Sequence, residues 1–148
     1  MTLRPALFIS LICLTFASAS SANTQSLQTQ RETVIKEYLA DLAAANYQDI
    51  ALLFDPNGYV VSTSRGHANA KEFFYAFLPN VTQAHTTLHA AFLSGGTPDT
   101  SAARFHLDFQ LKDGETGNGE YMDEFVFNPG STKLAAVYMF ENLQFPQA

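Results

Sequence analysis

The fold is decided near the C-terminus by GEYMDEFVFN, residues 119–128. Side chains alternate between the two faces of a β-strand, so this stretch presents one aromatic and one more polar face. The aromatic face carries Tyr121, Asp123, Phe125 and Phe127, and the other carries Glu120, Met122, Glu124 and Val126. We expect the aromatic face to be buried, with the carboxyl group of Asp123 among its rings.

Three more alternating runs flank this strand. They span residues 85–94, 101–112 and 132–145, and the separators at 95–98, 113–119 and 128–131 each contain Gly or Pro. Short segments of this composition form hairpin turns. The C-terminal half of the chain therefore predicts a four-stranded antiparallel meander.

The preceding segment has helical periodicity. From Gln30, apolar residues recur at three- and four-residue steps, which is typical of an amphipathic helix. Asn46 can cap a second helix that runs to Phe54, and Asn69 begins a third helix that Pro79 ends. Between the second and third helices we predict a turn at 55–58, a short strand at 59–62 and a loop at 64–67.

Helices segregated from an antiparallel sheet make an α+β fold. We predict one domain over residues 30–148, in which three helices pack against a strongly bent and mostly antiparallel sheet. A sheet bent in this way leaves a hollow on its concave side.

Residues 1–22 have the three parts of a secretory signal peptide. Arg4 precedes the apolar run ALFISLICLTFA at 6–17, and small residues then offer cleavage after Ala19 or Ala22. Twelve apolar residues are too few to span a membrane. We expect a secreted or periplasmic product with a flexible start at 23–29, no membrane attachment, and no cysteine, because Cys13 leaves with the leader.

The charge and composition of the chain limit which partners and cofactors it is expected to bind. The 148 residues include 8 basic and 14 acidic side chains, for a formal net charge of −6, and contain no basic run. Nucleic-acid binding requires clustered Lys and Arg, so nucleic acid is not an expected partner. No phosphate loop, dinucleotide motif or metal-ligand signature is present, and we expect neither a cofactor nor a metal site.

Asp123 is the main candidate for a functional group. Burial without a cation raises the pKa of a carboxyl group, and a neutral carboxylic acid can donate a hydrogen bond. Tyr38 lies on the apolar stripe of the first helix and could point into the same hollow. The alternative is structural: Asp123 accepts bonds from backbone or tyrosine, and Tyr38 belongs to the core.

Two segments resemble a known superfamily. EYLADLAAANYQDIALLF, 37–54, and YMDEFVFNPGSTKLAAVYMFEN, 121–142, are similar to nuclear transport factor 2-like proteins, closest to the ketosteroid-isomerase-like and polyketide-cyclase (SnoaL-like) branches. The resemblance covers residues 30–145. It implies a curved, cone-shaped sheet closed by three helices around a ligand pocket, and a homodimer.

The same resemblance implies roles for individual residues. Ketosteroid isomerases stabilise an oxyanion with a helical tyrosine and a strand aspartic acid, which match Tyr38 and Asp123. Their general-base aspartate matches Ser62, which does not take a proton from carbon near neutral pH. A donor pair without its base is compatible with a catalytic and with a purely binding role. The predicted pocket lining is Ser62, Phe73, Phe77, His89, Tyr121 and Phe125.

The histidines carry weaker hypotheses. His106 and Asp108 share a strand face and could form a pair, although a row facing solvent or a partner protomer is the simpler interpretation. On a strand, His85 and His89 lie roughly 13 Å apart and cannot share one metal ion. A further hypothesis makes His67, His85 or His89 the missing base.

Two functions follow. In the first, the exported protein binds a small apolar or aromatic molecule, with isomerase- or lyase-type chemistry on a carbonyl or phenol-like ligand. In the second, phenylalanine side chains fill the cavity and the domain is a non-catalytic dimeric binding or accessory module. Pocket size separates the two, because ligand pockets have volumes above about 300 Å³.

Overall fold

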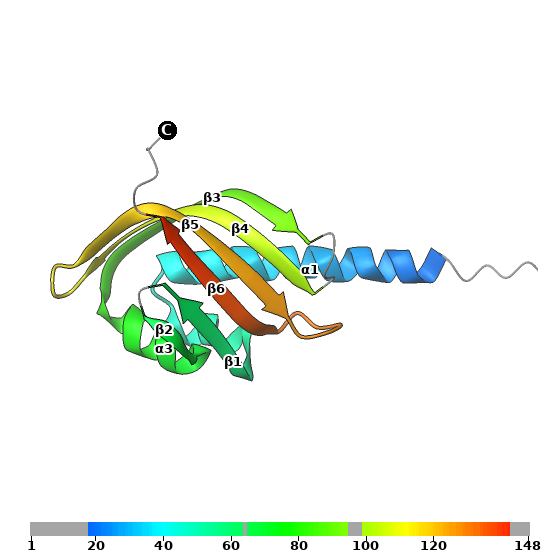
Figure 1. Ribbon diagram of the computed structural model, residues 1–148, viewed down its shortest axis with the longest axis horizontal. Helices are drawn as coiled ribbons and strands as arrows, with labels where there is room; N and C mark the ends of the chain where they lie inside the picture. Colours follow the sequence, from blue (N-terminus) through cyan, green and yellow to red (C-terminus); the bar gives the residue numbers. More distant parts are fainter. Residues whose placement is uncertain (1–17, 64, 95–98, 143–148) are drawn as a thin grey trace, which may run out of the picture.

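A curved sheet with helices on its concave side forms the protein in the computed structural model, which describes residues 18–63, 65–94 and 99–142 (Figure 1). The helices are α1 (Ser18–Ala43), α2 (Tyr47–Leu52) and α3 (Ala70–Phe77), followed by the short 3-10 helix η1 (Leu78–Asn80). The strands are β1 (Phe54–Ser62), β2 (Gly66–Asn69), β3 (Val81–Leu93), β4 (Thr100–Leu111), β5 (Thr116–Phe127) and β6 (Leu134–Asn142).

The six strands form one sheet in the order β2-β1-β6-β5-β4-β3. Strands β3 to β6 are the predicted antiparallel meander, β1 pairs in parallel with β6, and β2 pairs antiparallel with β1. The predicted α+β fold with a curved, mostly antiparallel sheet is confirmed. The sheet stays open, with β2 and β3 at its edges.

Helix α1 lies along the concave face (Figure 1). Its apolar stripe is buried there, and the stripe consists of Val34, Ile35, Tyr38, Leu39 and Leu42. The Thr86 hydroxyl of β3 donates to the Leu39 carbonyl at 3.1 Å, which ties the helix to the sheet edge. At α3, the Asn69 side chain accepts from the backbone N–H groups of Lys71 and Glu72, as expected of a capping residue.

Three local predictions were wrong. Helix α1 begins at Ser18 rather than Gln30, so residues 23–29, predicted to be flexible, are helical. The predicted turn at 55–58 lies inside β1, where the register with β6 is irregular. A Cβ on Gly58 would lie 3.0 Å from the Leu134 carbonyl oxygen, so glycine permits the close approach of these strands. The predicted loop at 64–67 contributes to β2.

Parts of the predicted leader and turns lie outside the described residues. These are the apolar run at 6–17 and the turn at 95–98. In the part of the chain that is described, no helix is both long and apolar enough to cross a membrane.

One buried cation anchors α1 to the far end of the sheet. Arg31 is 4% exposed, and its Nη2 forms an ion pair with Asp99 at 2.7 Å. The same guanidinium donates to the backbone carbonyls of Asn128 and Ser131 and lies over the Phe127 ring. Arg31 therefore connects the helix to the segment before β4 and to the β5–β6 turn.

Candidate functional site

A cavity of about 120 Å³ lies between α1, α3 and the concave face of the sheet. Aromatic side chains form the largest group on its wall, and they are Tyr38, Phe73, Phe74, Phe77, Phe105, Phe109 and Tyr121. Polar side chains interrupt this wall at Asp123, Ser62, Thr63, Arg65, Glu115 and Glu141. The cavity is thus an apolar site with a few polar groups, as small-molecule sites are.

Tyr38 and Asp123 meet at the inner wall of the cavity. The Tyr38 hydroxyl donates to Oδ2 of Asp123 at 3.2 Å, and both residues are buried. The Phe125 ring packs edge-on against Tyr38 with 5.1 Å between centroids. Oδ1 of Asp123 is buried and has no hydrogen-bond partner among the described residues, although buried polar atoms are normally paired.

The pKa of the Asp123 carboxyl is shifted toward the neutral form. Burial raises its pKa to about 8, against the smaller opposing effect of the bond from Tyr38. Burial also raises the pKa of Tyr38, with the Asp123 charge adding to the effect, so the phenol keeps its proton. Since Tyr38 donates to Oδ2, the acid proton is free to sit on Oδ1 and to be donated from there.

Four of the six predicted lining residues are on the cavity wall: Ser62, Phe73, Phe77 and Tyr121. Phe125 is not on it. It is fully buried behind Tyr38, because the helix covers this part of the strand.

His89 does not reach the cavity. On β3, Thr87 lies opposite His106, on the outer face of the sheet, and His89 is the next residue of the same alternation. The His89 side chain consequently lies on the opposite face of the sheet, where it contacts Glu120.

Glu141 is a wall residue that the sequence analysis missed. Its Oε1 accepts from the Tyr121 hydroxyl at 3.1 Å, and its Oε2 accepts from the Thr63 hydroxyl at 3.2 Å. Burial and the Glu141 charge raise the pKa of Tyr121 well above its usual range. The signal was present in the alternation of β6, where Glu141 follows Met139 on the same face.

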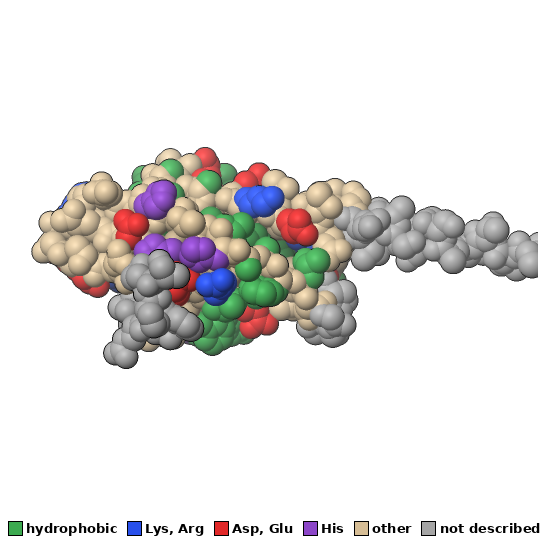
Figure 2. All heavy atoms as spheres, turned by 90° about the horizontal axis from the view of Figure 1, so that it is seen from above, with side chains coloured by type: hydrophobic (Ala, Val, Ile, Leu, Met, Phe, Trp, Pro, Cys, Tyr) green, Lys and Arg blue, Asp and Glu red, His purple; other side chains and the backbone are tan. Residues whose placement is uncertain are grey.

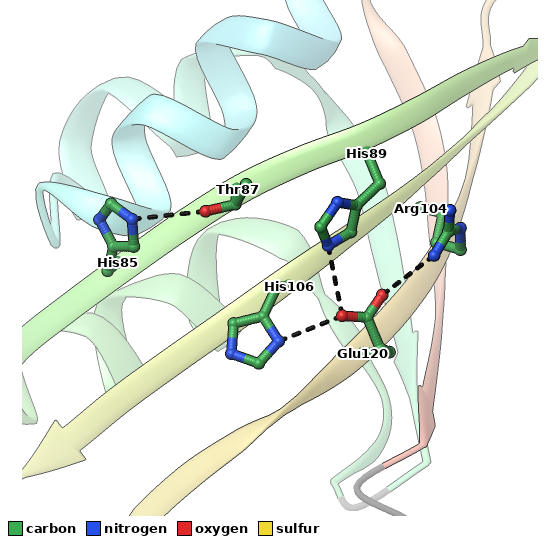
Figure 3. A network of polar contacts seen from close by, with 6 residues as sticks. All are labelled: His85, Thr87, His89, Arg104, His106 and Glu120. Carbon is green, nitrogen blue, oxygen red and sulfur yellow. Dashed lines mark hydrogen bonds and ion pairs between the residues drawn. The ribbon is translucent and has the colours of Figure 1, made fainter. Parts of the chain in front are cut away.

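The outer face of the sheet carries a polar cluster centred on Glu120, shown in close-up in Figure 3. Glu120 contacts His89 at 3.3 Å, His106 at 3.2 Å and Arg104 at 3.4 Å. His106 therefore pairs with Glu120 and not with Asp108. Figure 2 shows the histidines gathered on this face beside acidic and basic side chains.

The histidine hypotheses find no support in this arrangement. None of His67, His85 and His89 lines the cavity: His67 stacks on Tyr59, and His85 contacts Thr87. Among the described residues, no group of metal-ligating side chains is arranged to hold a metal ion.

Comparisons by sequence find nothing: no protein-family model matches the chain, and no curated protein matches it. Comparison of structures finds many similar chains. A pinacolase from Penicillium brevicompactum superposes with a TM-score of 0.66 at 13% identity, over 78% of this chain and 88% of its own. A scytalone dehydratase-like protein from Novosphingobium aromaticivorans gives 0.63 at 12% identity, over 82% and 88%.

A nuclear transport factor 2-like protein of unknown function from Exiguobacterium gives a TM-score of 0.61 at 14% identity, over 74% of this chain and 98% of its own. At such identities the likeness establishes the fold alone. The chain has the nuclear transport factor 2-like fold that its sequence resembled.

Proposed function

We propose that the cavity binds a small ring-shaped molecule through a carbonyl or phenolate oxygen that accepts a hydrogen bond from Asp123. The proposal rests on one observation: the buried Oδ1 of Asp123, on the cavity wall, has no partner among the described residues. A neutral carboxylic acid at this position can donate a hydrogen bond to an oxygen of the ligand. Tyr38 acts behind it, by holding Oδ2.

The cavity limits the ligand to a small ring. An engineered cavity of about 150 Å³ holds benzene, and the volume here is about 120 Å³. A single five- or six-membered ring is therefore the largest group that we expect inside this space, and further substituents would extend past the exposed Arg65 and Glu115. The dehydratase-like protein and the pinacolase among the structural neighbours support a ligand-binding use of the fold.

Removing the donor is expected to weaken binding of 4-nitrophenolate, whose visible absorbance reports its ionisation. A hydrogen bond to a charged acceptor contributes about 1.5–3 kcal/mol, so Asp123→Leu should reduce affinity by roughly 10- to 100-fold. Tyr38→Phe should reduce it less, because Tyr38 acts through Asp123. Absorbance titration measures the affinity of the unsubstituted protein, Asp123→Leu and Tyr38→Phe for 4-nitrophenolate.

The matched control is Tyr138→Phe. Tyr138 bonds to the Tyr59 hydroxyl at 3.0 Å and does not line the cavity, so its removal should leave affinity unchanged. Equal affinity in Asp123→Leu and the unsubstituted protein would contradict the proposed donor role.

Binding of 4-nitrophenolate should weaken as pH rises through about 8. Above this pKa, Asp123 ionises, so the site loses its donor and gains a negative charge beside the phenolate. Affinity should then fall about tenfold per pH unit, and Asp123→Leu should abolish this decline. Tyr38→Phe should move the decline to higher pH, because the Tyr38 bond lowers the pKa of Asp123. A decline at the same pH in all three proteins would contradict this assignment.

One observation favours the second function, a non-catalytic module with a filled cavity. The volume of about 120 Å³ is below the roughly 300 Å³ of ordinary ligand pockets. If this alternative holds, no ring-sized phenol or ketone binds and Asp123 is purely structural. Export and a homodimer remain predictions; secretion of a tagged chain and light scattering test them.

A further inference from the structure

Glu141 and Asp123 share the concave face of neighbouring strands. In the β5–β6 register, Tyr121 lies opposite Glu141 and Asp123 lies opposite Met139. Glu141 is thus diagonal to Asp123, and such residues lie roughly 7–8 Å apart. Both side chains line the same cavity, so a small ring bound at Asp123 would share the cavity with the Glu141 carboxyl group.

The surroundings of the two carboxyl groups differ. Asp123 is buried among rings, whereas Glu141 is half-buried and accepts one hydroxyl bond on each oxygen. None of the ion pairs found among the described residues involves Glu141. Each carboxylate oxygen has two lone pairs, so both oxygens retain the capacity to accept a proton while Tyr121 and Thr63 orient them.

We propose that Glu141 is a general base of this site and removes a proton from the carbon next to the carbonyl group of a small cyclic ketone. This inference rests on the proposed function, because Asp123 must hold the carbonyl oxygen. It places the base on β6, at a position different from Ser62, where the family resemblance implied it.

The step balances without a cofactor. A Glu141 oxygen takes the proton as the C–H bond breaks, and the electron pair forms the carbon–carbon double bond of an enolate. The carbonyl oxygen gains the negative charge and receives a hydrogen bond from Asp123. When the proton on Glu141 exchanges with solvent before a proton returns to the same carbon, the hydrogen on that carbon is exchanged. In a β,γ-unsaturated ketone, delivery of the proton to the γ-carbon moves the double bond instead.

Other groups on the wall are poorer bases. Tyr121 keeps its proton because burial and Glu141 raise its pKa, and the hydroxyl of Ser62 is a weak base. Glu115 is exposed and lies in the stretch that precedes β5. Apart from the donor Asp123, Glu141 is the carboxyl group among the described wall residues that hydrogen bonds orient.

Hydrogen exchange on cyclopentanone in D₂O, followed by proton NMR, tests the inference. The protein should accelerate exchange of the hydrogens next to the carbonyl over buffer. A general base contributes about 10²- to 10⁴-fold, so Glu141→Gln should reduce the protein-catalysed rate at least about 100-fold. The same variant should bind 4-nitrophenolate at least as tightly, because a negative charge near the ligand is removed.

The control is Glu124→Gln, on the outer face of β5, which should exchange at the unsubstituted rate. No acceleration by the unsubstituted protein, or an unchanged rate in Glu141→Gln, overturns the inference. The two proposals fail separately. Binding of 4-nitrophenolate with no exchange removes only the role of Glu141, whereas exchange that survives Asp123→Leu, with no binding, removes the role of Asp123.

Discussion

Asp123→Asn should raise the free energy of unfolding at pH 7 by about 4 kcal/mol. The pKa of Asp123 is raised from 3.8 to about 8 by burial. At pH 7 the unfolded chain is therefore ionised while the folded chain must hold a proton. Each pH unit between these values costs about 1.4 kcal/mol, and asparagine removes this cost while it keeps an oxygen that accepts from Tyr38.

The pH dependence of the free energy of unfolding follows from a carboxyl group whose pKa is higher in the folded than in the unfolded state. Its contribution favours folding most below about pH 4, declines as pH rises and levels off above about pH 8. Urea unfolding over this range should show the decline in the unsubstituted protein and its loss in Asp123→Asn. The exposed Asp113→Asn serves as the control. Equal stability of Asp123→Asn and the unsubstituted protein at pH 7 would mean that the carboxyl is ionised in the fold.

Arg31→Met should lower the free energy of unfolding by about 3 kcal/mol, the lower end of the cost of breaking a buried ion pair, because Arg31 is buried but the Asp99 side chain is 33% exposed and can be solvated. Methionine fills part of the space but cannot donate, so Asp99 and the carbonyls of Asn128 and Ser131 lose their partner. The contact with the Phe127 ring also loses its charge. Urea unfolding at neutral pH measures the effect.

Arg104→Met is the matched control. The Arg104 side chain is 49% exposed and pairs with Glu120 at 3.4 Å, and exposed pairs contribute at most about 1 kcal/mol. If the two variants lose equal stability, Arg31 is not the anchor that the geometry indicates.

Tyr38 and Asp123 could be predicted as site residues because each lies in a stretch with clear hydrophobic periodicity. Tyr38 lies on a helical stripe with a repeat of three and four residues, and Asp123 lies on an alternating strand. Each pattern specifies which face is buried without knowledge of the partner element. Packing α1 on the concave face then brings the two side chains together, as observed.

The site residues that were placed wrongly or missed depend on how the strands pair and on contacts between distant parts of the chain. His89 follows Thr87 on the outer face of β3, and only the pairing of β3 with β4 shows which of the two faces of β3 points outward. Glu141 becomes a neighbour of Tyr121 only through the β5–β6 register. Arg31 bonds to groups 68, 97 and 100 residues away, two of them backbone carbonyls with no sequence signature.

The most direct test of the central claim is the ionisation of Asp123 itself, followed by carbon-13 NMR of its side-chain carboxyl, with the signal assigned by its loss in Asp123→Asn. We expect a carboxyl group that is largely neutral at pH 7 and titrates near pH 8, and whose signal shifts when 4-nitrophenolate is added. A carboxyl that titrates near its ordinary value of about 4, and does not respond to the phenolate, would contradict it.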